Sequence, residues 1–254
     1  MPRYIYVYSI TTVQDRFPQF RNFLTPAWQV DRKWQRAEPG SCRPVLPAAC
    51  VRAAISVGLL WGWFKWAGLI IIGFLAMLHP GELVDLTRKD LVFPADTLGH
   101  TRSLFIHLRR PKTSRFARRQ HGRIDDEIAI AYLWSLVVGL GPDDKVYPAS
   151  LYSFHRQWNA IMDRLGLPSW AADKGATPGM LRGSGATHYY IATEDIPWLA
   201  WRGRWARART LECYLQEVTA QILLSEVTPI ARARIKQLDR AADSLLCYFS
   251  GASQ

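Results

Sequence analysis

The stretch that decides the fold is Trp201 to Glu217, WRGRWARARTLECYLQE. It places Tyr214 at the end of a run that carries four arginines, which are Arg202, Arg204, Arg207 and Arg209. A guanidinium group is well shaped to bind two phosphate oxygens at once. A phenol beside such groups indicates a tyrosine held against a phosphate, although a basic helix alone is also typical of a solvated surface. The rest of the chain has to decide between these interpretations.

The overall charge points to a polyanionic partner. The 254 residues include 32 basic and 21 acidic side chains, which gives a net charge of +11. Such an excess favours binding to nucleic acid or to an anionic membrane surface. A hydrophobic content of 49% is enough for a substantial buried core. We therefore expect a folded domain that binds a polyanion.

The common catalytic and metal-binding motifs are missing from the sequence. It has no glycine-rich phosphate loop, no HExxH, no CxxC pair and no GxSxG. The four cysteines show no paired spacing, and the first residues, MPRYIYVYSI, do not resemble a signal peptide. We therefore expect no cofactor and no metal, and reduced thiols in an intracellular protein.

One apolar segment leaves two interpretations open. Ile55 to Leu78 is nearly continuous apolar sequence and is long enough to span a bilayer, which would make the chain a small basic membrane protein. Lys65 lies inside it, and a charged side chain is costly in lipid. A pair of buried helices with a break near Gly62–Lys65 fits the same residues, and we expect no membrane contact.

Turn signals and periodicity divide the chain at about residue 44. Residues 1–44 predict a short N-terminal segment that could hold one helix between Val13 and Trp34. Residues 45–254 predict several helices, the last over Ile230 to Phe249, and strands near Leu91–Phe93 and Ser103–Arg109. A basic hairpin or loop follows the second strand.

Four ordered boxes then resemble the tyrosine recombinase (phage integrase) family. GFLAMLHPGELVDLTRKDL (Gly73 to Leu91) is similar to the first box and PKTSR (Pro111 to Arg115) to the hairpin that carries the family's lysine. TPGMLRGSGATHYY (Thr177 to Tyr190) is similar to the second box, and RGRWARARTLECY (Arg202 to Tyr214) to the third. The resemblance implies an α+β, mainly helical catalytic domain over 45–254, with helices around a small antiparallel sheet.

The resemblance also implies a reaction. The Tyr214 oxygen would attack a DNA phosphodiester and form a 3′-phosphotyrosyl link, which preserves the bond for rejoining without ATP or metal. Arg182 and Trp205, nine residues before Tyr214, would donate to the phosphate oxygens. Lys112 would protonate the leaving 5′-oxygen, and Glu82 would orient its neighbours. A type IB topoisomerase shares much of this set and remains an alternative.

Partners follow from the same resemblance. We expect double-stranded DNA as the partner, contacted by five arginines in particular: Arg115, Arg118, Arg119, Arg204 and Arg207. Family members assemble on DNA by exchanging a C-terminal segment, here Ile230 to Phe249, although its apolar stripe could equally pack on its own domain. The N-terminal segment is shorter than the family's DNA-clamping domain. The location implied is intracellular, with DNA, and nuclear in a eukaryote.

Two positions depart from the family pattern. The first-box arginine is His79, and imidazole cannot make the two-pronged contact of guanidinium. The second-box histidine is Gly179, which has no side chain. Losing one fixed donor costs roughly 10²–10³ in rate by analogy with oxyanion holes. The sequence therefore leaves two interpretations open. The protein is either an enzyme of DNA recombination and integration with attenuated activity, or a catalytically degenerate DNA-binding relative derived from a mobile element.

Overall fold

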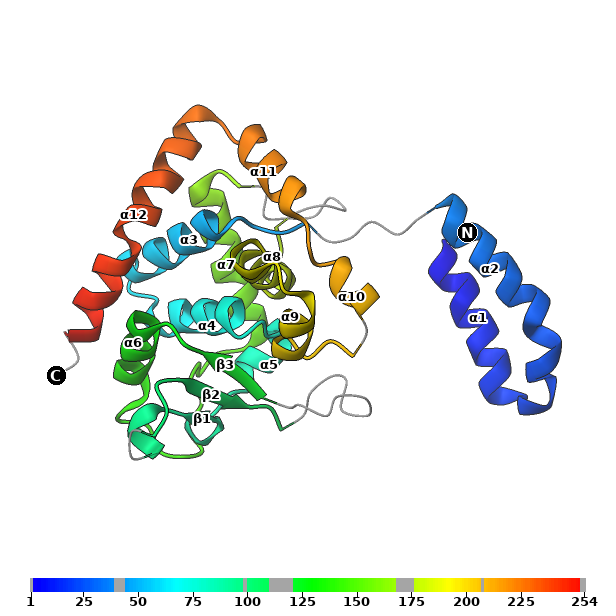
Figure 1. Cartoon of the computed structure of the whole chain (residues 1–254), viewed down its shortest axis with the longest axis horizontal. Coiled ribbons are helices and arrows are strands. Elements are labelled where there is room, and N and C mark those ends of the chain that lie inside the picture. Colours follow the sequence, from blue (N-terminus) through cyan, green and yellow to red (C-terminus); the bar gives the residue numbers. More distant parts are fainter. Residues whose placement is uncertain are drawn as a thin grey trace. The chain divides into compact units, whose positions relative to one another are not determined.

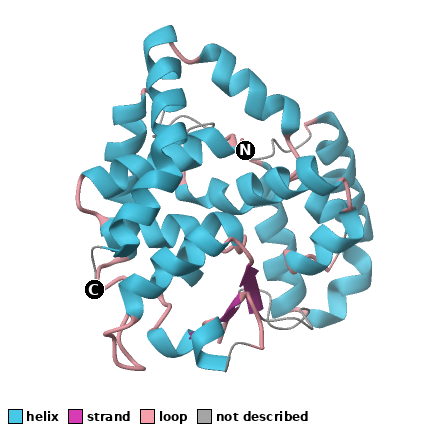
Figure 2. Ribbon diagram, turned by 60° about the vertical axis from the view of Figure 1, so that its left-hand side comes forward, coloured by secondary structure: helices cyan, strands magenta, loops and turns pink. Residues whose placement is uncertain are grey.

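The computed structural model describes residues 2–38, 44–97, 100–109, 121–167, 176–206 and 208–251, without the side chains of residues 208, 209 and 219. Within these ranges the chain is mainly helical, with one small antiparallel sheet (Figures 1 and 2). This confirms the predicted α+β, mainly α class. Contacts divide the chain into two compact units, Met1–Cys42 and Arg43–Gln254, which are described separately.

The first unit is a helical hairpin. It consists of α1 (Arg3–Arg16), the 3₁₀ helix η1 (Pro18–Leu24) and α2 (Thr25–Ala37). The expected single helix between Val13 and Trp34 is therefore wrong, because Pro18 ends the first helix and Pro26 occupies the first turn of the next. Arg3 pairs with the buried Asp31 at 2.7 Å and ties the two helices together.

The long apolar segment forms two buried helices of the second unit. These are α3 (Ala48–Leu60) and α4 (Phe64–Leu75). The chain turns between them at Gly62, whose φ of 73° lies in the left-handed region that glycine adopts without steric cost. The predicted break near Gly62–Lys65 is confirmed. Among the described residues, no helix is both long and apolar enough to cross a membrane.

The sheet has three short antiparallel strands in the order β1 (Leu91–Val92), β2 (Leu104–His107) and β3 (His121–Ile124). Leu104 and Ile106 of β2 point into the core, paired with Ile124 and Leu91 respectively. The predicted basic segment connects β2 to β3, and its residues 110–120 lie outside the described ranges.

Short helices complete the region around the sheet. α5 (Pro80–Val84) begins at Pro80, because proline fits the first helical turn. The 3₁₀ helices η2 (Arg88–Asp90) and η3 (Pro94–Thr97) flank β1. α6 (Glu127–Val137) follows β3, with Asp126 capping its N-terminus.

The remaining helices follow α6 along the chain. They are α7 (Leu151–Leu165), the 3₁₀ helix η4 (Pro178–Met180), α8 (Leu181–Thr193), α9 (Ile196–Arg202), α10 (Ala208–Glu212), α11 (Glu217–Glu226) and α12 (Pro229–Gly251). α8 crosses α4 so closely that a Cβ at Gly185 would lie 2.0 Å from the Phe74 carbonyl oxygen. This close approach fixes the position of α8, which carries Arg182.

The last helix packs along α3 of the same unit (Figure 1). Arg52 of α3 pairs with Asp239 at 2.7 Å and with Asp243 at 2.8 Å, and the Ser56 hydroxyl donates to the Leu238 carbonyl. Of the two arrangements expected for this segment, the structure contains the one in which it packs on its own domain.

Candidate functional site

Arg182 lies at the centre of the candidate site. It is the second residue of α8, and only 6% of the residue is exposed. Its Nη1 donates to the Met77 carbonyl at 2.8 Å, and its Nη2 donates to the Gly203 carbonyl at 2.6 Å. These bonds join α8 to the segment after α4 and to the turn after α9. The guanidinium is therefore fixed by backbone from two distant parts of the chain.

Trp205 packs directly on this guanidinium. The Arg182 Cζ lies 4.4 Å from the centre of the Trp205 ring, within the range of a cation–π interaction. The turn that holds Trp205 requires glycine at position 203, because a Cβ there would lie 1.6 Å from the indole. The Trp205 amide donates to the Ala200 carbonyl at 2.9 Å and closes the turn.

Tyr214 completes this group of three side chains. Its ring centre lies 5.3 Å from that of Trp205, the ring that packs on the Arg182 guanidinium. The Thr187 hydroxyl of α8 donates to the Tyr214 carbonyl at 2.7 Å. A Cβ at Gly183 would lie 3.2 Å from the tyrosine ring, so α8 also supports the ring closely. Arg182, Trp205 and Tyr214 thus lie together, and they are three of the residues to which the family resemblance gives a role at the phosphate.

Burial alters the acidity of the central arginine. Desolvation, followed by the positive charge of Arg204, lowers the pKa of Arg182 to about 10, against the opposing effects of Glu82 and Tyr214. The guanidinium still carries its charge at neutral pH. A buried cation of this kind interacts strongly with an anion because little water screens it.

Glu82 of α5 links the first box to this group. Its Oε2 accepts the backbone N–H of His79 at 2.9 Å, and its carboxylate pairs with Arg204 at 3.2 Å. Burial alone raises the pKa of Glu82, but the Arg204 charge and the His79 N–H outweigh it and hold that pKa below 4.5. Glu82 is therefore an ionised carboxylate that positions Arg204.

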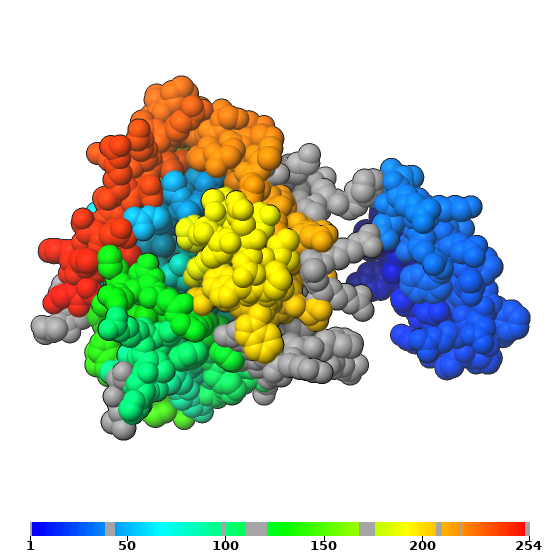
Figure 3. Space-filling view, in the orientation of Figure 1, coloured from blue at the N-terminus to red at the C-terminus, as the bar shows by residue number. Residues whose placement is uncertain are grey.

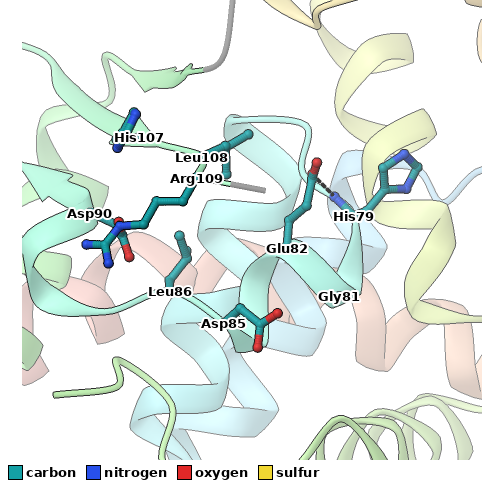
Figure 4. A pocket seen from close by; sticks show the side chains of 9 residues that line it. All are labelled: His79, Gly81, Glu82, Asp85, Leu86, Asp90, His107, Leu108 and Arg109. Carbon is teal, nitrogen blue, oxygen red and sulfur yellow. Dashed lines mark hydrogen bonds and ion pairs between the residues drawn. The ribbon is translucent and has the colours of Figure 1, made fainter. Parts of the chain in front are cut away.

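A cavity of about 630 Å³ opens beside Glu82 (Figure 4). Its lining includes His79, Glu82 and the ion pair of Arg109 with Asp90, whose facing atoms are 2.7 Å apart. Figure 4 shows the Glu82 carboxylate turned back onto the His79 backbone. His79 therefore lies at this cavity, at the position where the family pattern has an arginine.

Two arginines of the opening stretch are not on a solvated face. Arg202 is buried, pairs with Asp125 at 2.8 Å and donates to the Arg123 carbonyl, so α9 is joined to the residues after β3. Figure 3 shows residues around 200 (yellow) beside this sheet region (green). The Arg204 side chain is only 4% exposed and faces Glu82. Both partners are far away in sequence, so no local pattern could have identified these roles.

The structure adds little about the other predicted site residues. Gly179 is half-buried in η4 and contributes no side chain. The remaining ones lie outside the described residues, namely Lys112, Arg115, Arg118, Arg119 and Arg207. None of the described residues forms a cluster of His, Cys, Asp and Glu suited to a metal ion.

Comparison with known proteins identifies the fold. No model of a protein family matches the sequence, and no curated protein matches it. Among solved structures, the chain is similar to one described as "Crystal structure of XerA recombinase", with a TM-score of 0.53 and 15% sequence identity. The match covers 89% of this chain and 83% of that one. The chain therefore has a fold distantly similar to that of a tyrosine recombinase.

Proposed function

We propose that this protein binds double-stranded DNA and breaks and rejoins it through Tyr214. The observation that carries the proposal is the packing of Trp205 on the buried Arg182 guanidinium at 4.4 Å, with the Tyr214 ring 5.3 Å from the Trp205 ring. A nucleophile beside a fixed cation suits attack on a phosphodiester, because the negative charge of the transition state would develop next to that cation. The fold similarity to a recombinase supports the same reaction class.

The proposed step is a transesterification. The Tyr214 oxygen bonds to phosphorus, the bond from phosphorus to the 5′-oxygen breaks, and the 3′-phosphate remains on the tyrosine. The phenol loses one proton to solvent or to a neighbouring base, and the 5′-oxygen gains one, for which we propose Lys112 as the donor. Reversal of the same step by a 5′-hydroxyl rejoins a strand, so one active site serves cleavage and joining.

The surroundings of the site support a nucleic-acid substrate. The net charge of +11 favours a polyanion, and the basic segment between β2 and β3 starts at Arg109, on the wall of the cavity beside Glu82. We propose that Arg115, Arg118, Arg119 and Arg207 contact DNA phosphates. Site-specific recombination, integration and an intracellular location with DNA form part of the same proposal.

A second candidate function is DNA binding without strand cleavage. It is favoured by His79 and Gly179, which leave the family's first arginine and its second-box histidine unfilled. Such a protein would be a catalytically degenerate relative derived from a mobile element. It would retain salt-sensitive binding to duplex DNA and would form no covalent link.

Assembly on DNA through α12 is a further part of the proposal. The Arg52 pairs with Asp239 and Asp243 support packing within one chain, and the same pairs could form between two copies that exchange the helix. We also propose that residues 1–44 act as a DNA-contacting extension of the catalytic domain over 45–254. Light scattering of the protein with and without duplex DNA measures the assembly directly.

A nicked suicide substrate distinguishes the two candidate functions. A pool of duplexes of randomised sequence, each with a nick that releases a short 5′-hydroxyl product, traps any phosphotyrosyl intermediate. Wild type should form a covalent adduct, Tyr214→Phe should form none, and the control Tyr248→Phe, at an exposed tyrosine of α12, should behave as wild type. Binding without an adduct under all conditions would establish the second candidate instead.

A further inference from the structure

Arg204 occupies an unusual place for an arginine in a basic run. Its side chain is only 4% exposed, and its Nη1 and Nη2 face the two carboxylate oxygens of Glu82 at 3.5 and 3.2 Å. This fork-to-fork pair leaves the Nε side of the guanidinium unused. Arg204 therefore has a fixed orientation inside the candidate site, set by a residue of the first box.

Two buried donors of the site lack an acceptor. In the part of the chain that the structure describes, Nε of Arg182 and Nε of Arg204 are both buried without a hydrogen-bond partner. Buried donors are nearly always satisfied, and an unsatisfied one calls for an explanation such as an absent ligand. An acceptor-rich ligand that meets both guanidinium groups would satisfy both atoms.

The charges of the site also favour an anion. The Arg182 Nη2 donates to the carbonyl of Gly203, the residue directly before Arg204, so two positive charges lie in the same part of the fold. Glu82 supplies one negative charge against these two. The cluster thus carries an excess of one positive charge where water is largely excluded. A bound phosphate oxygen would relieve this excess.

The backbone at Arg204 is strained. Its φ of 63° lies in the left-handed region, which residues other than glycine rarely adopt. Met77, whose carbonyl accepts from Arg182, has a φ of 53°. Strain of this kind persists only where the surrounding contacts hold it, and it gathers at functional sites.

We propose that Arg204 and Arg182 form a two-guanidinium cradle for one phosphate, with Glu82 as the positioning residue of Arg204. The inference rests on the proposed function, and it assigns to Arg204 the phosphate contact that an arginine at position 79 would have made. His79 then need not carry that charge. The ligand class is a phosphodiester of DNA, and free inorganic phosphate has the same chemistry.

Inorganic phosphate is a probe that requires no DNA cleavage. We expect it to raise the melting temperature of wild type, relative to chloride at equal ionic strength, by roughly 3–6 °C at ten times its Kd. Arg204→Gln should lose most of this shift. Arg240→Gln, which removes the same charge from an exposed position of α12, should keep it.

Loss of folding in Arg204→Gln would have a clear origin, because the variant leaves Glu82 ionised and unpaired. The double variant Glu82→Gln/Arg204→Gln removes that charge, and its two amides can bond to each other. It should also lose the phosphate shift. An undiminished shift in these variants, or no shift in wild type, would overturn the cradle.

The covalent adduct separates this inference from the proposed function. Arg204→Gln should slow adduct formation by roughly 10²–10³, as loss of one fixed donor does at an oxyanion hole, and Arg240→Gln should not slow it. An adduct that forms equally fast in Arg204→Gln leaves the proposed function intact and removes the cradle. Phosphate binding that depends on Arg204, without any adduct, keeps the cradle and removes the nucleophile.

Discussion

At the scale of single residues, the candidate site depends on backbone that holds side chains in place. Arg182 is fixed by the carbonyls of Met77 and Gly203, and both come from segments distant in sequence. A donor whose position is already fixed loses little freedom when it binds an anion, and this preorganisation is what an electrostatic catalyst needs. Changes at the supporting positions should therefore alter the site as much as changes at the charged residues.

Gly203 is such a supporting position. Gly203→Ala would place a Cβ 1.6 Å from the Trp205 indole and should push that ring off Arg182. We expect a loss of about 1–3 kcal/mol in the free energy of unfolding, as for overpacking in other cores. Chemical denaturation measures it, and Gly139→Ala, which has open space at its Cβ, serves as the control. Equal stability of the two variants would contradict the described packing.

Glu82 should leave a signature in the pH dependence of stability. Its pKa in the folded protein is lowered, so its ion pair stabilises the fold above pH 4.5 and is lost as pH falls through the folded pKa. Glu82→Gln should therefore flatten the fall in unfolding free energy below pH 4.5. Glu226→Gln, at an exposed carboxylate, should follow the wild-type curve. A Glu82→Gln curve as steep as wild type would contradict the ionised pair.

At the scale of elements, the crossing of α4 and α8 positions the whole site. Gly185 lies at this crossing, and a Cβ there would meet the Phe74 carbonyl oxygen at 2.0 Å, a backbone atom that cannot rotate away. Gly185→Ala should therefore separate the helices and lower the melting temperature more than Gly203→Ala does. It should also weaken adduct formation, because α8 carries Arg182. A variant that melts like Gly139→Ala would show that the helices are less tightly packed.

Helices, strands and sequence motifs can be predicted where neighbouring residues determine them. The break at Gly62 and the strands near residues 91 and 104 follow from turn residues and alternation, whereas the roles of Arg182, Trp205 and Tyr214 are implied by the family resemblance. Pro18 and Pro26 already argue against one helix between Val13 and Trp34, and they divide the helical hairpin that the structure contains. The pair of Arg204 with Glu82 spans 122 residues, and no local pattern encodes such a contact.

At the scale of the whole molecule, the net charge of +11 should make the proposed DNA binding sensitive to salt. The logarithm of the binding constant should fall linearly with the logarithm of salt concentration, with a slope of about −0.9 for each phosphate contacted. Arg118→Gln/Arg119→Gln, in the connection between β2 and β3, should make the slope less steep by about 2. Fluorescence anisotropy of a labelled duplex measures the binding constant at each salt concentration. An unchanged slope would show that Arg118 and Arg119 do not contact DNA phosphates.

The most direct test of the account is the residue to which DNA becomes attached. Tryptic cleavage after Arg209 and Arg232 gives a peptide, residues 210–232, in which Tyr214 is the one tyrosine. Mass spectrometry of the trapped adduct, after nuclease trimming, should find the nucleotide mass on that peptide, on the phenol of Tyr214. Attachment to any other peptide, or DNA binding with no covalent product at all, would contradict the central claim.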